Sequence, residues 1–485
     1  MTLMQGSKID STQFTVDFTI PDYVQSVARI LIKEGYSCYL VGGALRDVVM
    51  DILPDDYDLA TDALPEAMLG IFPKAVSTGI RFGTVTVLVQ DSSEVRHEVQ
   101  VTTLRSEQQY VDGRWPAHVK FVTDIDEDLS RRDFTWNAMA LDFSQTELDG
   151  KDEEKTWSIY DPFEGKKDLW RKVVRAVGDP VERFTEDGLR AFKACRMAAQ
   201  LEFEIEAPTY EAITKTLPVA RKISMERIRD EFTKMLKNSA KPSIGVDLMR
   251  KSGLLEIFMP ELLETFGVEQ PVYHADDVYS HLLKSMDAAP VDIRLAALFH
   301  DIGKPRKAMP GGHFYGHDIE SEKMTVEIMR RMKYSRSEID RIACLVRHHM
   351  FYYPIPEEGA SKEEIEKYEA HLWTDSAVRR FMARVGEENI EDLFELRIAD
   401  AAGNPKTMFQ PDEIEKLQER ISDVRSKDMA LKITDLDING HDLNELGIPP
   451  GPKMGEILQK LLEKVLDDPG LNDKETLKKL VEEMK

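Results

Sequence analysis

The periodicity of apolar residues along the chain changes near residue 180. Residues 22–35 carry apolar side chains at helical spacing, and this predicted helix ends at Gly35, a residue that favours helix C-termini. Apolar or alternating runs then predict a helix at 44–51 and strands at 37–43, 55–61, 82–90 and 95–104. Beyond about residue 180, helical periodicity continues almost to the C-terminus. The pattern predicts an α/β or α+β head with a small sheet, followed by helical domains.

Length and composition limit the class of protein. A chain of 485 residues is too long for one hydrophobic core and should form about three or four domains. No apolar run approaches the roughly 18 to 20 residues of a membrane span, and the polar N-terminus has no signal-peptide core. We therefore expect a cytosolic protein without a membrane partner. The cysteines are few and far apart in the sequence, which favours neither a disulfide framework nor a metal site: Cys38, Cys195 and Cys344.

The net charge of −24 argues against a protein that coats nucleic acid nonspecifically, because such binding requires an excess of Lys and Arg. It does not exclude local basic grooves. Positive charge is concentrated at Arg131-Arg132 and in the run from Lys166 to Arg175. Solvated helix faces are the favoured explanation of most of these charges.

Two carboxylates near the second predicted strand indicate a cation site. Residues two apart on a strand face the same side, so Asp56 and Asp58 should project together. Their mutual repulsion is relieved by a cation, and Mg²⁺ prefers oxygen ligands and phosphates. The Gly42-Gly43 pair would let backbone N–H groups approach a phosphate, with Arg46 one turn into the following helix. Together these features predict a nucleoside triphosphate site, although each alone also fits a turn or a helix cap.

The order of the motifs resembles the class II tRNA nucleotidyltransferases and bacterial poly(A) polymerases, a family within the polymerase-β-like nucleotidyltransferases. Five blocks carry the resemblance, in the order 39–66, 98–142, 160–169, 178–206 and 223–236. The resemblance implies an α+β fold with a small mixed-sheet head and largely helical neck, body and tail. The implied domains are a catalytic head at 1–150, a base-recognising neck at 151–236, a connector at 237–272, a metal-binding domain at 273–405 and a tRNA-binding tail at 406–485.

The family assigns roles to the residues that match its motifs. Asp56 and Asp58 would hold two Mg²⁺ ions that activate the RNA 3′-hydroxyl and bind the triphosphate, as in other two-metal transfers. Many relatives have a third carboxylate where this chain has Gln100, and Glu98 is the candidate substitute. The family pattern also marks a set of nucleotide-binding residues: Gly42, Gly43, Arg46, Arg105, Arg132, Asp133, Asn137, Asp187, Arg190 and Arg196.

Two of these motifs have structural alternatives. Asp133 would read the ribose 2′-hydroxyl in the family, whereas it would otherwise cap a helix over 134–141. Asp187 and Arg190 would hydrogen-bond the Watson–Crick edge of CTP or ATP. In a segment that is helical after about Thr185, they would otherwise form an intrahelical ion pair.

The C-terminal half contains a second candidate metal site. The His300-Asp301 doublet follows an apolar helix and resembles the HD superfamily, in which an earlier His and a later Asp complete a divalent metal site. His281 and Asp400 match these outer positions, and Mg²⁺ or a divalent transition metal would bind. Further histidines cluster nearby in the sequence and are additional candidates: His274, His313, His317, His348 and His349.

The leading hypothesis is template-independent addition of CCA, from CTP and ATP, to the 3′ end of tRNA. Residues 107–122 resemble a loop that enzymes adding the terminal A possess, which disfavours CC-only addition. A-only addition and poly(A) polymerase activity stay open. A different hypothesis makes the HD domain the active unit, a metal phosphohydrolase acting on 2′,3′-cyclic nucleotides or phosphates. The protein would be a monomer or a homodimer.

Overall fold

The computed structural model describes residues 12–91, 93–111, 115–145, 155–270, 276–310, 312–353, 363, 373–404, 406, 409, 412–427 and 432–484. The chain forms two compact units, residues 1–258 and 259–485. His274 and residues 112–114 of the predicted loop lie outside the described residues. Of the described helices, none combines the length and apolar character needed to cross a bilayer. All three cysteines are free.

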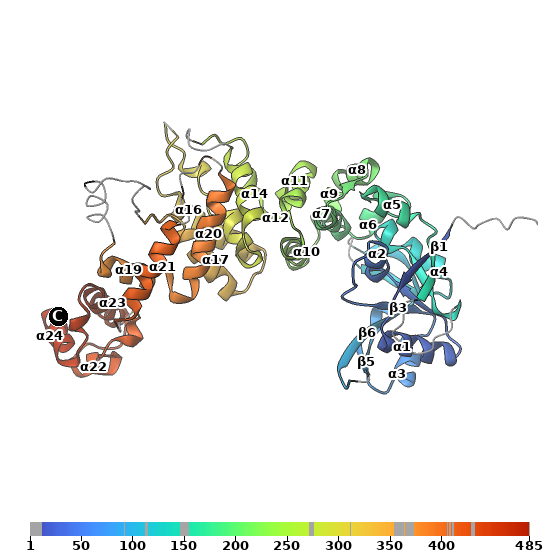
Figure 1. Cartoon of the computed structure of the whole chain (residues 1–485), viewed down its shortest axis with the longest axis horizontal. Coiled ribbons are helices and arrows are strands. Elements are labelled where there is room, and N and C mark those ends of the chain that lie inside the picture. Colours follow the sequence, from blue (N-terminus) through green and yellow to red (C-terminus); the bar gives the residue numbers. More distant parts are fainter. Residues whose placement is uncertain are drawn as a thin grey trace, which may run out of the picture. The chain divides into compact units, whose positions relative to one another are not determined.

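The first unit contains the sheet, at the blue end of the chain in Figure 1. Within this sheet, as far as the structure describes it, β3 and β6 are the only parallel neighbours, and the other neighbours are antiparallel. The predicted mixed-sheet α+β head is confirmed. The eight strands follow the order β1 (Gln13–Phe18), β10 (Lys155–Tyr160), β9 (Ala140–Asp142), β2 (Cys38–Val41), β3 (Asp58–Thr61), β6 (Arg96–Thr103), β5 (Thr84–Gln90) and β4 (Ala75–Gly79).

The sheet extends past residue 150, where the sequence predicted the head to end, because β10 pairs with both β1 and β9. The predicted strand at 55–61 begins only at Asp58. The predicted N-terminal helix is α1 (Asp22–Lys33), and Gly35 follows it with a φ of +90°. Strands β7 (Arg105–Val111) and β8 (Trp115–Phe121) form a separate hairpin over the predicted loop.

A buried apolar cluster joins the centre of the sheet to helix α4 (Ile125–Ser130). It includes Val41 of β2, Ala60 of β3, Ala140 of β9 and Leu129 of α4. Leu129 is fully buried, and such burial contributes about 2 kcal/mol. The cluster holds α4, and with it Asp128, against the sheet.

Helices lie between and after the strands of the first unit (Figure 1). They include α2 (Gly43–Val49), the 3-10 turn η2 (Thr135–Asn137), α5 (Gly165–Arg171), α6 (Pro180–Glu186), α7 (Leu189–Leu201), α8 (Ala207–Lys215) and α10 (Met225–Asn238). Helix α10 packs against α7, with Phe232 of α10 buried beside Phe258.

The second unit is helical. Helices α14 (Val278–Ala288), α15 (Arg294–Phe299), α16 (His317–Arg331), α17 (Arg336–His348) and α20 (Ile390–Gly403) pack together. Gly403 permits the close approach of α20 to α14, because a Cβ there would lie 2.2 Å from Ser285 Oγ. Helices α19 (Asp375–Val385), α23 (Pro452–Asp467) and α24 (Lys474–Met484) continue the unit, and Leu461, Val465, Leu477 and Val481 form a second buried cluster there.

Candidate active site

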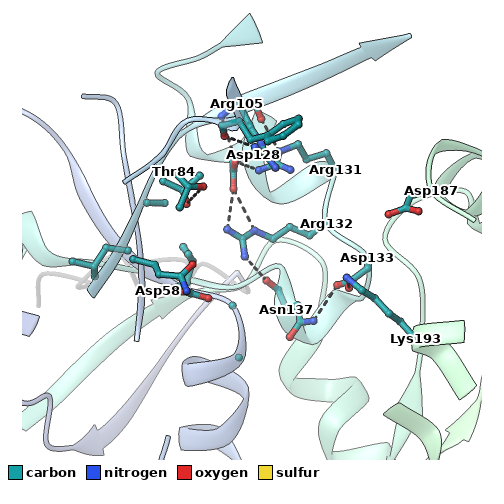
Figure 2. Close-up of a pocket in the computed structure, with 18 of the residues that line it drawn as sticks. Asp58, Thr84, Arg105, Asp128, Arg131, Arg132, Asp133, Asn137, Asp187 and Lys193 are labelled. Carbon is teal, nitrogen blue, oxygen red and sulfur yellow. Dashed lines mark hydrogen bonds and ion pairs between the residues drawn. The ribbon is translucent and has the colours of Figure 1, made fainter. Parts of the chain in front are cut away.

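A cavity of about 640 Å³ opens at the head sheet and the helices that follow it (Figure 2). It brings together nine of the residues predicted from the motifs: Gly42, Gly43, Asp58, Arg105, Arg132, Asp133, Asn137, Asp187 and Arg190. Residues that the motifs did not single out also line it, including Thr84, Thr102, Asp128, Lys193 and Arg227. Four predicted residues do not line it, namely Asp56, Glu98, Arg46 and Arg196.

Asp58 is the first residue of β3 and lies opposite Val41 of β2 and Gln100 of β6. Burial and the nearby Asp56 raise the pKa of Asp58 to about 6, although Arg132 opposes this shift. Asp56 precedes the strand and is exposed, while Tyr57 between them is buried. The two carboxylates therefore repel each other, but they do not share a strand face as the spacing predicted, because β3 begins only at Asp58 and Asp56 does not line the cavity.

Gln100, and not Glu98, lies beside Asp58. Gln100 is the register partner of Asp58 and lines the cavity, whereas Glu98 pairs with Leu88 of β5, one repeat farther along β6. A strand rises about 3.3 Å per residue, so this displacement is roughly 7 Å. The structure does not bring Glu98 to the cavity, and the assignment of a third carboxylate to it has no support from the geometry.

Asp128 organises the arginines of the cavity (Figure 2). Its Oδ1 lies 2.6 Å from Arg131 Nη2, and its Oδ2 lies 3.0 Å from Arg132 Nη2. Burial would raise the pKa of Asp128, but the two guanidinium groups outweigh it and hold the pKa below its usual range. The sequence analysis missed Asp128, although its spacing of three and four residues from two arginines on a helix was a usable signal.

Arg132 also contacts the glycine turn. It donates from Nη1 to the backbone oxygen of Asn137 at 3.3 Å. At Gly42 a Cβ would lie 3.4 Å from Arg132 Nη1 and 3.8 Å from Asp58 Oδ2. Gly42 has a φ of +79°, which L side chains rarely adopt, so both conformation and space favour glycine here.

Asp133 accepts hydrogen bonds from the Phe134 backbone N–H at 2.9 Å and from Asn137 Nδ2 at 3.0 Å. Lys193 Nζ lies 3.7 Å from its other carboxylate oxygen. Burial raises the pKa of Asp133, but Lys193 and these hydrogen bonds outweigh it and lower the pKa. The alternative of a helix over 134–141 is wrong, because the chain makes only the short turn η2 before strand β9.

Asp187 and Arg190 do not lie on one continuous helix as predicted. Helix α6 ends at Glu186, Asp187 has extended backbone angles, and α7 begins at Leu189. Gly188 weakens helix continuity, and Asp187 Oδ1 accepts from the Leu189 N–H at 3.0 Å. The alternative of an intrahelical ion pair is therefore wrong.

Each of the two residues is held by a different partner. Arg227 Nη2 of α10 lies 2.9 Å from Asp187 Oδ2. Arg190 lies 2.6 Å from Glu186 Oε2 and donates from Nη2 to the Arg131 backbone oxygen at 2.7 Å. These contacts fix a carboxylate and a guanidinium group at one wall of the cavity.

Two arginines that were predicted to bind the nucleotide pair instead with carboxylates of the protein. The Arg46 guanidinium pairs with Asp47 and lies 5.7 Å from the ring centroid of buried Trp136. Arg196 pairs with Glu231 of α10 at 2.7 Å. Long basic side chains pack along apolar surface and reach any carboxylate nearby, so sequence position alone does not define their direction.

The predicted HD residues converge in the second unit. His281 Nε2 lies 3.1 Å from Asp400 Oδ1, and His300 Nε2 lies 3.3 Å from Asp301 Oδ2. The two imidazole Nε2 atoms are 3.2 Å apart. His281, His300 and Asp301 form one group whose ligand atoms lie within 4.8 Å of one another, a spacing that can hold a metal ion.

A second group shares Asp301. His317 Nε2 and His349 Nε2 lie 3.1 Å and 3.5 Å from Asp301 Oδ1, and these three residues form another possible metal-binding set. The other two described candidates lie apart from the two sets. His313 stacks on Tyr315, and His348 sits beside Arg347, which together with burial lowers its pKa.

Family models match three regions of the chain. The model described as the poly A polymerase head domain matches residues 38–175. A probable RNA and SrmB-binding site of polymerase A matches 202–265, and a putative tRNA nucleotidyltransferase domain 2 matches 318–481. The sheet, the cavity and these matches define the class as a nucleotidyltransferase with a head of the poly(A) polymerase type.

Individual relatives narrow the class. A CCA-adding enzyme of Leuconostoc mesenteroides is 30% identical over 460 residues, which cover 95% of each chain. A CCA-adding enzyme of Lactobacillus helveticus is 45% identical over 209 residues, 43% of this chain, and the match spans about half of that relative, 48%. The crystal structure of a Bacillus stearothermophilus CCA-adding enzyme in complex with CTP has a TM-score of 0.66 and 25% identity, covering 95% of this chain and 96% of that one. The chain belongs to the family of CCA-adding enzymes, as the motifs predicted; the HD domain stays a prediction.

Proposed function

We propose that the protein adds CCA to the 3′ end of tRNA, using CTP and ATP and releasing pyrophosphate. The observation that carries the proposal is a single cavity that joins the Asp58 carboxylate to the carboxylate and guanidinium groups of Asp187 and Arg190. The first predicts nucleotidyl transfer and the second predicts which nucleotide is used. Membership of the CCA-adding enzyme family supports both the proposed nucleotidyl transfer and the proposed choice of nucleotides.

Asp56 and Asp58 would hold two Mg²⁺ ions. The raised pKa of Asp58 supports this, because burial beside a second carboxylate leaves negative charge that a cation would neutralise. When bound, two Mg²⁺ ions stabilise the attacking and leaving oxygens of a phosphoryl transfer. Arg132, fixed by Asp128 beside Gly42, would pair with the triphosphate.

Asp133 and Asn137 would read the ribose. Asp133 retains acceptor capacity beyond its two hydrogen bonds, and it lines the cavity on the side of Lys193. A carboxylate that is kept ionised accepts a hydrogen bond from a 2′-hydroxyl, which deoxyribose lacks. The protein would therefore prefer ribonucleotides.

Asp187 and Arg190 would select the base without a nucleic-acid template. The exocyclic amines of cytosine and adenine donate to a carboxylate, and their ring nitrogens accept from a guanidinium group. Uracil and guanine present the opposite pattern at these positions. The salt bridges to Arg227 and Glu186 keep both groups in place before the nucleotide arrives.

The tail of the second unit would bind the body of the tRNA. A groove of about 800 Å³ lies there between α19 and α23 and carries a group of basic residues: Arg380, Arg384, Lys432, Lys460 and Lys464. Such local positive charge contrasts with the acidic chain as a whole and suits a phosphate backbone.

The test uses tRNA transcripts ending at the discriminator base, at C and at CC, each incubated with Mg²⁺ and labelled CTP or ATP. We expect two C residues and one A to be added in order, and no addition from UTP or GTP. Product lengths on a sequencing gel check the outcome. Addition of A only, and only to the CC transcript, would instead select the A-adding alternative. Long A tracts would select poly(A) polymerase, and incorporation of neither nucleotide would contradict all three.

A second candidate function is a metal-dependent phosphohydrolase in the second unit. The observation that favours it is the orientation of the imidazoles. The Nδ1 atoms of His300, His317 and His349 lie 2.7–2.8 Å from backbone oxygens, which puts a proton on Nδ1 and leaves Nε2 as an acceptor whenever the imidazole is neutral. His317 Nε2 and His349 Nε2 are buried and both face Asp301 Oδ1. Acceptor nitrogens facing carboxylate oxygens suit a divalent cation, which would supply an activated water for phosphate ester hydrolysis.

Removing the shared carboxylate should abolish metal binding at this cluster. We expect Asp301→Asn to lose the metal that the wild-type protein retains after incubation with Co²⁺ and desalting, because Asp301 belongs to both sets of ligands. Elemental analysis measures the metal content. A thermal shift provides an independent readout, since Co²⁺ should raise the melting temperature of the wild type but not that of Asp301→Asn.

His313→Ala is the matched control, because His313 lies outside both sets. This variant should retain the metal, and both variants should incorporate CTP and ATP at the wild-type rate. Equal metal content in wild type and Asp301→Asn would contradict the metal site without affecting the proposed CCA addition.

A further inference from the structure

Helix α5 presents an aromatic and basic face that the proposed active site does not use. Trp170 of this helix is 72% exposed, whereas Trp136 and Trp157 in the same unit are fully buried. The helix lies within the basic run from Lys166 to Arg175 that the charge pattern singled out. Single exposed aromatic residues are common on protein surfaces, so a binding role for Trp170 has to be argued from the residues around it.

Lys166 holds the indole ring in place. Its Nζ lies 4.7 Å from the Trp170 ring centroid and 4.1 Å from the ring centroid of Phe14 on edge strand β1. A cation between two aromatic rings is attracted to both of their faces. Lys166 therefore fixes the orientation of the Trp170 indole ring, and most of the ring stays exposed to solvent, where a partner can contact it.

The charge around Trp170 is positive and largely uncompensated. Asp168, the one acidic residue of the run, is buried and pairs with Arg175 at 2.7 Å. Lys167 pairs with Glu164. Within the described residues, no carboxylate lies within ion-pair distance of exposed Arg171 or Lys172. In a chain of net charge −24, this is a local site of attraction for anions.

We propose that α5 and the adjoining end of β1 form an RNA-binding surface. A base of the RNA stacks on Trp170, while Lys166, Arg171 and Lys172 neutralise neighbouring phosphates. Every nucleobase has a π-face, so an aromatic platform with surrounding cations binds RNA without sequence preference. This proposal rests on the proposed function in one respect: the RNA that binds to the surface is the tRNA substrate.

The position of α5 relates this surface to the cavity. The helix packs against η2 and α2, which contribute Asn137 and Gly43 to the cavity wall. The stacking surface thus belongs to the same unit as the active site but lies one layer behind it. It would hold a part of the tRNA other than the 3′-terminal nucleotide, so its loss should weaken tRNA binding and leave nucleotide binding intact.

The experiment measures binding of a fluorescently labelled tRNA transcript without CCA to the full-length protein by anisotropy, over a series of salt concentrations. We expect Trp170→Ala to weaken binding about tenfold, and Trp170→Phe to restore most of it, because stacking needs an aromatic ring. Arg171→Gln with Lys172→Gln should reduce the slope of log affinity against log salt by about 1 to 2. Lys215→Gln on α8, an exposed lysine paired with Glu211, is the control and should bind like the wild type.

The steady-state readout separates this surface from the active site. Trp170→Ala should raise the KM for tRNA and leave the KM for CTP unchanged. Wild-type affinity and salt slope in both the Trp170→Ala and the Arg171/Lys172 variants would overturn the proposal. A change in molecular mass by light scattering, with unchanged RNA affinity, would also overturn it and assign the face to self-association. A protein that binds the transcript through Trp170 but incorporates no nucleotide would contradict the proposed CCA addition and leave this proposal standing.

Discussion

Replacing Asp58 with asparagine should lower the rate of CTP and ATP incorporation by at least about a thousandfold, which corresponds to about 4 kcal/mol of transition-state stabilisation. Of the predicted pair Asp56 and Asp58, Asp58 lines the cavity, at the start of β3 beside Gly42 and Gln100. An amide keeps the shape of the side chain but not the charge that would bind Mg²⁺. Single-turnover incorporation onto a transcript ending in CC measures the loss.

The matched control is Asp55→Asn, because Asp55 is exposed and does not line the cavity. Its activity should stay within about twofold of the wild type, as expected for a surface substitution. In metal-free buffer, Asp58→Asn should melt no lower than the wild type. Burial and Asp56 raise the pKa of Asp58 to about 6, so its charge opposes folding at neutral pH when no cation is bound. Incorporation by Asp58→Asn at the wild-type rate would contradict the assignment of the catalytic carboxylate.

Replacing Asp128 with asparagine should lower the free energy of unfolding of the first unit by about 3 kcal/mol, because it leaves two partly buried guanidinium groups without their carboxylate. Asp128 is almost completely buried, and the side chains of Arg131 and Arg132 are 16% and 19% exposed. We also expect incorporation to fall, since Arg132 would no longer be held beside Gly42. Urea unfolding at neutral pH, together with the incorporation assay, measures both effects.

The pH dependence distinguishes an ion pair from a packing effect. The pKa of Asp128 is lowered in the folded state, so its contribution is complete above the unfolded-state pKa of about 4 and is lost as the pH falls through the folded-state value. The difference in stability between wild type and Asp128→Asn should therefore shrink at acidic pH. Asp126→Asn, an exposed change on the same helix, is the control. A pH-independent difference would contradict the electrostatic explanation.

The amino-acid pattern predicted the parts of the site that depend on neighbours in sequence. The strand at 82–90 appears as β5 and the strand at 95–104 as β6, because alternating apolar residues need only one buried face to define them. The glycine turn and one of the two predicted carboxylates likewise lie where the motifs placed them, with Gly42 and Asp58 at the cavity wall. Motifs with a fixed local geometry can be recognised before the fold is known.

Side-chain direction and strand register limited the remaining predictions. Arg46 and Arg196 belong to matching motifs, yet their guanidinium groups pair with Asp47 and Glu231 away from the cavity. The register between β3 and β6 places Gln100 beside Asp58. Glu98 and Gln100 lie on the same face of the strand, so alternation of apolar residues alone cannot tell which of them is the neighbour of Asp58. The break between α6 and α7 followed from Gly188 and the cap at Asp187.

The sequence by itself determined the family of this protein: the residue types, their spacing and their order along the chain resemble those of the CCA-adding enzymes, to which the chain belongs. Only the tertiary structure decided which of those residues meet. It buried Asp128 between two arginines, and it brought His317 and His349 to Asp301 through the packing of successive helices. Local periodicity records which face of an element is buried, whereas the packing of elements far apart in the chain decides which polar groups share a site.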